Sequence, residues 1–157
     1  MKRSGLFPGS FDPFTKGHEA VVLKALAVFD EIIIGVGINS KKQSYFTLES
    51  RMEHIASLFV DYPAVKVCKY QKLTVDFCKE IGATHIVRGL RDSKDFEYEK
   101  TIADANRTLD PTIETIFLTG EPKYTSVAST IVRDIIRNGG DASPFLPDVI
   151  SRSIPAV

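Results

Sequence analysis

Apolar residues along the chain gather in five short runs that are separated by longer stretches of mixed polarity. The runs are rich in Ile, Val, Leu and Phe, and each is too short to form a helix that could pack by itself. They therefore predict buried strands. The five runs are residues 5–7, 32–38, 65–70, 84–88 and 115–118.

The stretches between these runs show apolar residues at helical spacing. Two stripes occupy residues 20–27 and 48–59, and a shorter one at residues 75–81 is stopped by a glycine. Residues 96–109 predict a longer helix that ends before a proline, and residues 131–136 predict a last one. Strand and helix therefore alternate, which indicates a parallel sheet covered on both faces.

The size and charge of the chain limit the number of domains and the kinds of partner that we expect. With 157 residues, 43% of them hydrophobic, it fits one domain over residues 1–157, with residues 141–157 as a C-terminal helical tail. Twenty basic and twenty acidic side chains balance, so no overall field attracts nucleic acid or a membrane. No signal-peptide or membrane-spanning pattern is present, so we expect a cytoplasmic protein in which Cys68 and Cys78 are buried thiols.

The segment after the first predicted strand has the composition of an anion-binding loop. It reads PGSFDPFTKGH over residues 8–18, at the edge where ligands bind in open parallel sheets. Gly9 allows close approach of the backbone, and Ser10 supplies a hydroxyl. We expect His18 in the first helical turn, where free N–H groups and the helix dipole favour phosphate.

This segment resembles the signature of the nucleotidyltransferase superfamily, G-x-F-D-x-x-H-x-G-H or its T-x-G-H form. Thr15 replaces the first histidine of that signature and still offers a hydroxyl. The loop is neither a P-loop nor a dinucleotide fingerprint, because their glycine patterns are missing. His54 and His85 lie outside any motif and are predicted to be structural.

A second group of candidate residues lies at the end of the fourth predicted strand. Arg88 and Arg91 flank a Gly-Leu pair, and residues 95–99 read DFEYE. Two guanidinium groups at a sheet edge can bind two different phosphates. The competing interpretation is that both arginines form surface ion pairs with the nearby acidic residues.

The sequence R-G-L-R followed by D-F-x-Y-E resembles the phosphopantetheine adenylyltransferase family. The resemblance also includes F-T-L-E at residues 46–49, with Arg51 after it, and Phe-Leu-Pro at residues 145–147. It implies a single Rossmann-like α/β domain, with a five-stranded parallel sheet in the order 3-2-1-4-5 and helices on both faces.

The resemblance also implies roles for individual residues. His18, Lys42 and Arg91 would be catalytic. The acceptor would be bound by Ser10, Lys42, Thr74 and Arg88. ATP would be bound by Ser10, Phe11, His18, Gly89, Leu90, Arg91, Glu99, Tyr124, Thr125, Ser126, Val127, Ala128, Ser129 and Thr130.

Two departures from the family pattern leave questions open. The loop between the lysines and Phe46 is one residue longer than usual, so counting back from Phe46 selects Lys42, whereas counting from the strand selects Lys41. The late motif I-S-S-[ST] reads VAST at residues 127–130, so one hydroxyl is missing. ATP contacts there would then depend on the remaining hydroxyls and on backbone N–H groups.

The predicted function is adenylyl transfer from ATP to 4'-phosphopantetheine, with Mg²⁺ as cofactor, in coenzyme A biosynthesis. No carboxylate cage for the metal is evident, so no protein ligand is assigned to it. The alternatives are a superfamily member with a nicotinamide-mononucleotide or glycerol-phosphate acceptor, and a noncatalytic nucleotide-binding sensor. The resemblance further implies a homohexamer, and coenzyme A is a candidate feedback ligand.

Overall fold

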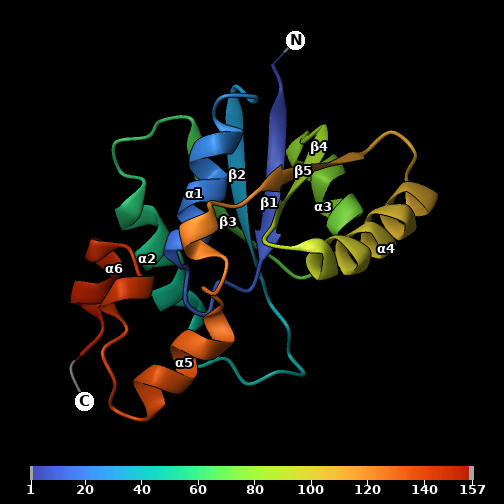
Figure 1. Cartoon of the computed structure of the whole chain (residues 1–157). Coiled ribbons are helices and arrows are strands. Elements are labelled where there is room, and N and C mark those ends of the chain that lie inside the picture. Colours follow the sequence, from blue (N-terminus) through green and yellow to red (C-terminus); the bar gives the residue numbers. More distant parts are fainter. Residues whose placement is uncertain (1, 156–157) are drawn as a thin grey trace.

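The protein, described here by a computed structural model over residues 2–155, is built on one five-stranded parallel sheet. The strand order is β3-β2-β1-β4-β5, which confirms the predicted topology (Figure 1). The strands are β1 (Ser4–Gly9), β2 (Glu31–Gly37), β3 (Val65–Tyr70), β4 (His85–Leu90) and β5 (Glu114–Thr119).

Helices cover both faces of this sheet. Figure 1 shows α3 and α4 on one face, and α1, α2, α5 and α6 on the other. The α-helices are α1 (Lys16–Ala25), α2 (Leu48–Leu58), α3 (Thr74–Ile81), α4 (Ser93–Leu109), α5 (Ser129–Arg137) and α6 (Asp148–Ser153). Two short 3-10 helices are η1 (Pro122–Tyr124) and η2 (Ser143–Phe145).

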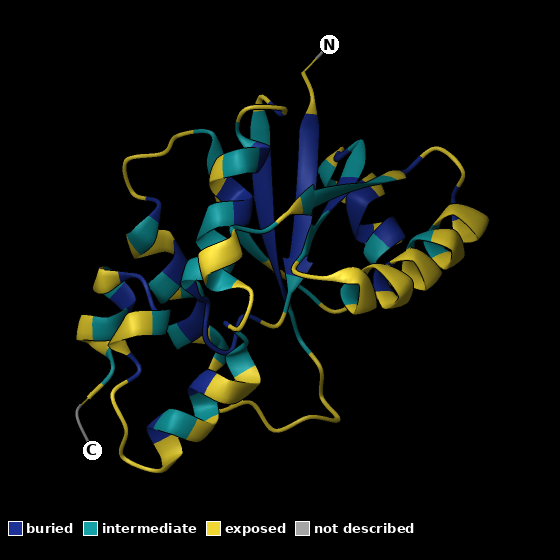
Figure 2. Ribbon diagram, in the orientation of Figure 1, coloured by how far each residue is buried: buried dark blue, intermediate teal, exposed yellow. Residues whose placement is uncertain are grey.

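The core is divided by the sheet into two apolar clusters, because successive side chains of a strand point to opposite faces. Phe7 of β1 belongs to the larger cluster under α1, α2, α5 and α6, whereas its neighbour Leu6 belongs to the smaller cluster under α3. The buried strands at the centre of Figure 2 lie between these two layers. Because β1 and β4 are adjacent and parallel, their carboxyl ends lie side by side at one edge of the sheet.

The element boundaries differ from the sequence prediction in a few places. α4 begins at Ser93 rather than at residue 96, because the Asp92 side chain accepts a hydrogen bond from the backbone N–H of Asp95 at 2.9 Å and caps the helix. The tail forms η2 and α6, and residues 156–157 lie outside the described residues. Cys78 is buried as expected, but Cys68 is only partly buried, which corrects the prediction for that thiol.

Helix α4 is the least buried of the long elements. It has 17 residues, and Glu99 is its only buried side chain. Figure 2 shows most of this helix as exposed. Within residues 2–155, no helix is long and apolar enough to cross a lipid bilayer.

Candidate active site

The turn after β1 is tightly constrained. A side chain at Gly9 would place its Cβ 2.8 Å from the ring of Phe11, closer than packed atoms approach one another. Phe11 itself has φ of 49°, in the left-handed region that residues with a Cβ rarely adopt. Such backbone persists only where surrounding structure holds it, and it is concentrated at functional sites.

Thr15 and His18 hold each other at the start of α1. Thr15 is the N-cap, and its hydroxyl accepts a hydrogen bond from the backbone N–H of His18 at 3.4 Å. In return the backbone N–H of Thr15 donates to Nδ1 of His18 at 3.0 Å. Thr15 is buried, and its hydroxyl both caps the helix and lies 3.1 Å from Nδ1 of His18.

The imidazole of His18 lies among aromatic rings beside two arginines. Its ring centroid is 5.1 Å from that of Phe11 and 5.2 Å from that of Phe14. Burial, together with the positive charges of Arg88 and Arg91, lowers the pKa of His18 to about 3. The ring is therefore neutral near pH 7, with Nδ1 as an acceptor and Nε2–H left as a donor.

Arg88 is fixed by a bidentate ion pair. Its Nε and Nη2 atoms donate to the carboxylate of Glu99 at 2.7 and 2.6 Å, and its Nη1 atom donates to the carbonyl oxygen of Pro8 at 2.6 Å. Glu99 was predicted to bind ATP, and the structure gives it a different direct contact, with Arg88. The remaining donors of the guanidinium group can still bind a phosphate.

Arg91 pairs with a carboxylate of its own turn. Its Nε atom donates to Asp95 at 3.0 Å, and its backbone N–H also donates to Asp95, at 2.9 Å. The guanidinium lowers the pKa of Asp95, chiefly through this side-chain hydrogen bond. The surface ion pair that was the competing interpretation of Arg91 is thus present, and the arginine nonetheless lines a cavity.

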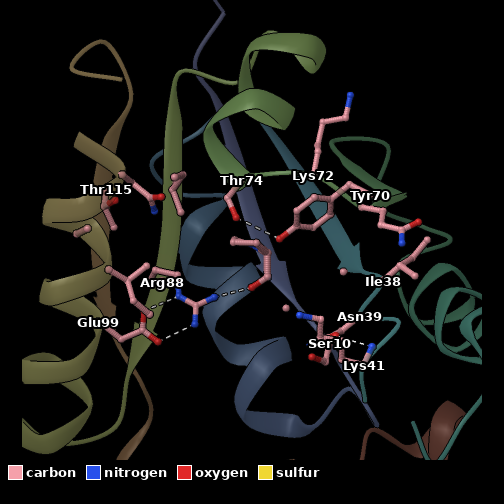
Figure 3. A pocket seen from close by; sticks show the side chains of 18 of the residues that line it. Ser10, Ile38, Asn39, Lys41, Tyr70, Lys72, Thr74, Arg88, Glu99 and Thr115 are labelled. Carbon is pink, nitrogen blue, oxygen red and sulfur yellow. Dashed lines mark hydrogen bonds and ion pairs between the residues drawn. The ribbon is translucent and has the colours of Figure 1, made fainter. Parts of the chain in front are cut away.

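Two cavities meet at the turn after β1. The first has a volume of about 500 Å³ and the second about 410 Å³. They share the wall formed by Pro8, Gly9, Ser10, Arg88 and Glu99. Figure 3 shows Ser10, Arg88 and Glu99 at the edge of the first cavity. Two ligands bound side by side would therefore come together at Ser10 and Arg88.

The first cavity extends from this wall between β2, β3 and α4. Thr74 lines it, and the Thr74 hydroxyl lies 3.3 Å from that of Tyr70 (Figure 3). The ring of Tyr70 stacks on that of Phe77 at a centroid distance of 4.7 Å. Lys41 lines this cavity, whereas Lys42 lines neither cavity. The structure thus places Lys41, and not the predicted Lys42, at the wall.

The second cavity lies between α1, η1 and α5. It contains most of the predicted ATP residues: Ser10, Phe11, His18, Gly89, Leu90, Arg91, Glu99, Tyr124, Val127, Ala128, Ser129 and Thr130. Thr125 and Ser126 do not line it and are exposed. Ala128 is the N-cap of α5 and makes no side-chain cap bond, while the Ser129 hydroxyl donates to the carbonyl oxygen of Pro13 at 2.8 Å.

Several lining residues were not assigned to the site from the sequence. Tyr70, Ile102 and Asn106 belong to the first cavity, and Arg133 belongs to the second. Arg133 lies one helical turn after Thr130, so the periodicity of α5 could have identified it. Asn106 lies on the face of α4 that carries Glu99, seven residues away, and the same rule applies to it.

The carboxylates of the second cavity are already engaged in contacts within the protein. Each binds a cation or backbone N–H groups: Asp12, Asp95, Glu99 and Glu121. Over residues 2–155, no cluster of three or more His, Cys, Asp or Glu side chains is arranged to hold a metal ion. The cavity walls offer a phosphate mainly N–H donors and positive charge.

Comparison with known proteins agrees with this geometry. The cytidylyltransferase-like family model matches residues 6–135. A protein named phosphopantetheine adenylyltransferase from Phocaeicola vulgatus is 53% identical over 93% of this chain and 96% of its own length. The protein of that name from Flavobacterium psychrophilum is 49% identical over 94% of this chain and 97% of its own length.

Solved structures show the same fold at low identity. A bifunctional NMN adenylyltransferase/ADP ribose pyrophosphatase from Francisella tularensis aligns with a TM-score of 0.69 and 21% identity. The alignment covers 93% of this chain and 45% of that one. A second structure, of such a protein complexed with AMP and a Mn ion, aligns with a TM-score of 0.67 at 20% identity and covers 93% of this chain and 44% of that one. The fold and the extended sequence identity together show that this chain belongs to the cytidylyltransferase-like family and to the phosphopantetheine adenylyltransferase family within it.

Proposed function

We propose that this protein transfers the adenylyl group of ATP to 4'-phosphopantetheine, giving dephospho-coenzyme A and pyrophosphate. The observation that carries the proposal is the meeting of two cavities at Ser10 and Arg88, with His18 in the wall of the second. A transfer between two bound phosphates requires such a junction. Relatives that are 45–53% identical are named for this reaction.

The first cavity is the site proposed for the acceptor. Arg88 stands at its junction with the second cavity, Lys41 lies along its wall, and Thr74 is the first residue of α3. Positive charge at the junction suits the phosphate end of the acceptor. The elongated remainder of the cavity, toward Ile102 and Asn106, suits the pantetheine arm. The role first given to Lys42 passes in this proposal to Lys41.

The second cavity is the site proposed for ATP. The backbone N–H groups at the start of α5 lie at its wall without a side-chain cap, so they are free to bind phosphate oxygens. Gly89 and Arg91 line the same space. The missing hydroxyl at Ala128 therefore leaves these N–H groups uncovered. Thr125 and Ser126 stay as predicted ATP residues that the cavity does not include.

The reaction then needs positioning more than proton transfer. An oxygen of the acceptor phosphate attacks the α-phosphorus of ATP, a new P–O bond forms, and the bond to the β-phosphate oxygen breaks to release pyrophosphate. The acceptor phosphate is largely dianionic, since its second pKa is about 6, so no general base is required. Neutral His18 donates Nε2–H to the charge that develops on the transferring phosphate, and Arg88 and Arg91 neutralise it.

Mg²⁺ is proposed to enter as part of the MgATP substrate. The cavity carboxylates are engaged with cations or backbone N–H groups, so they do not form a ready cage for the ion. Mg²⁺ is commonly held through substrate phosphates and water. A bifunctional protein that shares this fold over part of its length has been solved with AMP and a Mn ion, which agrees with a divalent metal beside the nucleotide.

The alternatives differ in the acceptor or in the absence of chemistry. A nicotinamide-mononucleotide or glycerol-phosphate acceptor would make this a different superfamily enzyme, and a sensor would bind nucleotide without turnover. Identity near 50% to phosphopantetheine adenylyltransferases argues against both the other acceptors and the sensor. The charged side chains of Arg88 and Arg91 and the imidazole of His18 are all present in the second cavity, which argues against a sensor.

The test is pyrophosphate release from ATP and Mg²⁺ with a panel of phosphorylated acceptors. Turnover with 4'-phosphopantetheine, and not with nicotinamide mononucleotide or glycerol phosphate, is the expected result. Turnover with another acceptor alone would replace the proposed substrate. Binding of ATP without turnover on any acceptor would establish the sensor.

Assembly and regulation belong to the same proposal. The exposed side chains of α4 include Phe96, Tyr98 and Leu109, which supports contact of this helix with another copy of the chain, and the family resemblance implies a hexamer. A monomeric mass by light scattering would contradict this. Coenzyme A, whose pantetheine arm matches the acceptor, would compete with the acceptor for the first cavity.

We also propose that residues 1–157 form one domain and that the protein is located in the cytoplasm.

A further inference from the structure

The loop that carries the lysines has few contacts of its own. Residues 40–45 are all exposed. Inside the loop, the side chain of Asn39 accepts a hydrogen bond from the backbone N–H of Lys41 at 3.0 Å, and its carbonyl oxygen accepts one from Lys42 at 3.2 Å. These bonds shape a turn but do not fix where that turn lies relative to the first cavity.

Asp12 holds the far end of this loop. Its carboxylate accepts two backbone hydrogen bonds, from Tyr45 at 2.7 Å and from Phe46 at 2.8 Å. Both N–H groups immediately precede Thr47, the N-cap of α2. The carboxylate is buried, with 6% of Asp12 exposed. A buried carboxylate whose two oxygens each bind a separate backbone N–H fixes both position and direction of the chain there.

The same residue is tied to the second cavity through its backbone. The carbonyl oxygen of Asp12 accepts a hydrogen bond from Nη1 of Arg133 at 2.8 Å, and Arg133 lines that cavity. In addition, the guanidinium of Arg137 lies 5.3 Å from the ring centroid of Tyr45. The end of the lysine loop is thus joined to the turn after β1 and to α5.

We infer that Asp12 is a positioning residue for the acceptor, acting through Lys41 by anchoring the loop at Tyr45 and Phe46. The inference rests on the proposed function, because it assigns the lysine loop to the acceptor phosphate. Asp12 lines the second cavity, but both hydrogen bonds of its carboxylate are with the backbone of the loop, at Tyr45 and Phe46. Its loss should therefore weaken acceptor binding before it alters ATP binding.

Asp12→Asn is the first test. Asparagine offers one acceptor oxygen in place of two, so one of the two loop N–H groups loses its partner. We expect the KM for 4'-phosphopantetheine to rise about tenfold, the order of one lost hydrogen bond to a charged group, while the KM for ATP stays within about twofold. Asp141→Asn is the matched control, because the Asp141 carboxylate also accepts from a backbone N–H, that of Ser143 at 2.9 Å, and lines neither cavity.

A double-mutant cycle separates positioning from general destabilisation. In a background in which Lys41 and Lys42 are both replaced by alanine, Asp12→Asn should raise the acceptor KM no further. A full additional rise in that background would overturn the inference. Equal rises in both KM values, or no change in either, would also overturn it. A wild-type protein without turnover would instead contradict the proposed function.

Hydrogen exchange tests the anchor without any activity. In the wild-type protein, the amides of Tyr45 and Phe46 should exchange slowly and those of the exposed Gln43 and Ser44 fast. In Asp12→Asn, protection at Tyr45 and Phe46 should fall while that of β2 is kept. If this variant does not fold, Asp12→Glu, which keeps the charge and adds one methylene, takes its place. Fast exchange at Tyr45 and Phe46 in the wild type would overturn the inference directly.

Discussion

The backbone N–H of Thr15 donates to Nδ1 of His18 across 3.0 Å, and this bond determines which nitrogen of the neutral ring carries the proton. Because Nδ1 is the acceptor, the proton is on Nε2. The hydroxyl of Thr15 lies 3.1 Å from the same nitrogen and also helps to hold the ring in this orientation. The threonine of the T-x-G-H motif thus orients the histidine that follows it.

The first prediction concerns the protonation state of His18. Its pKa is lowered to about 3 by burial and by the nearby arginines, so the ring should remain neutral as pH falls from about 8 to about 5. Nitrogen-resolved NMR of the ligand-free protein should show the Nε2–H tautomer, without a titration step, over that range. A step near the ordinary histidine pKa of 6.5, or the Nδ1–H tautomer, would contradict the geometry.

The same lowered pKa predicts a direction for stability. Between pH 6.5 and about 3, the unfolded chain binds a proton at this histidine and the folded protein does not. The contribution of His18 to the free energy of unfolding is therefore intact above pH 6.5 and declines as pH falls below it. Urea denaturation at about pH 7.5 and about pH 5 should show a smaller decline in His18→Asn than in the wild type. An equal decline in both proteins would contradict the assignment.

Replacement of His18 by alanine tests its chemical role. Loss of one donor to developing phosphate charge should lower kcat by about 100- to 1,000-fold, by analogy with the loss of an oxyanion donor. The helix cap is weakened as well, at a cost of about 1 kcal/mol in the free energy of unfolding. Steady-state kinetics and urea denaturation measure the two effects separately.

His85→Gln is the matched control for that variant. His85 is the first residue of β4, three residues before Arg88, and its Nδ1 atom is 2.8 Å from the hydroxyl of Thr84. Its replacement should leave kcat within about twofold, because His85 lines neither cavity. Near-normal turnover of His18→Ala would remove His18 from the mechanism.

The two lysines of the loop give a paired prediction. Lys41 lines the first cavity and Lys42 does not, although both are exposed. Lys41→Ala should therefore raise the KM for 4'-phosphopantetheine about tenfold, the effect of losing one charge-assisted contact, and Lys42→Ala should raise it less than about threefold. Kinetics on the two variants decide between them. The reverse order would restore the assignment made by counting back from Phe46.

The strands and helices could be predicted almost completely from the sequence, for a physical reason, whereas the order of the strands came from the family resemblance. Strands buried on both faces read as short apolar runs, and helices on a sheet read as amphipathic stripes, so the alternation identifies both. The start of α4 was missed because it depends on the Asp92 cap, a local polar contact without apolar periodicity. Burial of Cys68 was overestimated because β3 is an edge strand and is less covered.

The site could be predicted only where its residues are adjacent in the sequence. The turn after β1 and the two arginines, Arg88 within β4 and Arg91 directly after it, were found as motifs, and the structure brings them to one site. The bond from Arg133 to Asp12 joins residues 121 positions apart, and no pattern in the sequence reveals it. The choice between Lys41 and Lys42 likewise depends on the path of an exposed loop, which residue spacing does not determine.

The ion pair between Arg88 and Glu99 predicts a coupling between two substitutions. Arg88→Ala leaves the buried Glu99 carboxylate without its cation and beside the proposed phosphate site. We expect a loss of acceptor binding that exceeds the loss of ATP binding, and a lower free energy of unfolding. In Arg88→Ala/Glu99→Gln the stability should recover in part, because no unpaired carboxylate remains. Additive losses in the double variant, measured by urea denaturation, would show that the pair does not act as a unit.

Close packing between Gly89 and Val21 gives the last prediction. A Cβ at Gly89 would lie 2.6 Å from Cγ2 of Val21, which is buried on α1. Gly89→Ala should therefore lower the free energy of unfolding by about 1–3 kcal/mol through overpacking, and move α1 with its His18 away from β4. Without that contact the same change would be expected to stabilise by about 0.4–1 kcal/mol, because alanine restricts the unfolded chain.

Val21→Ala removes the atom that causes the clash, so Gly89→Ala should cost little in that background. Gly37→Ala is the control for stability, since its Cβ would find its nearest neighbour at 3.7 Å, an ordinary contact distance. Urea denaturation of the wild type, the two single variants, the double variant and the control measures the coupling. If Gly89→Ala is as destabilising in the Val21→Ala background as in the wild type, the contact between β4 and α1 is not the reason for glycine at this position, and a requirement of the bound nucleotide for space becomes the better explanation.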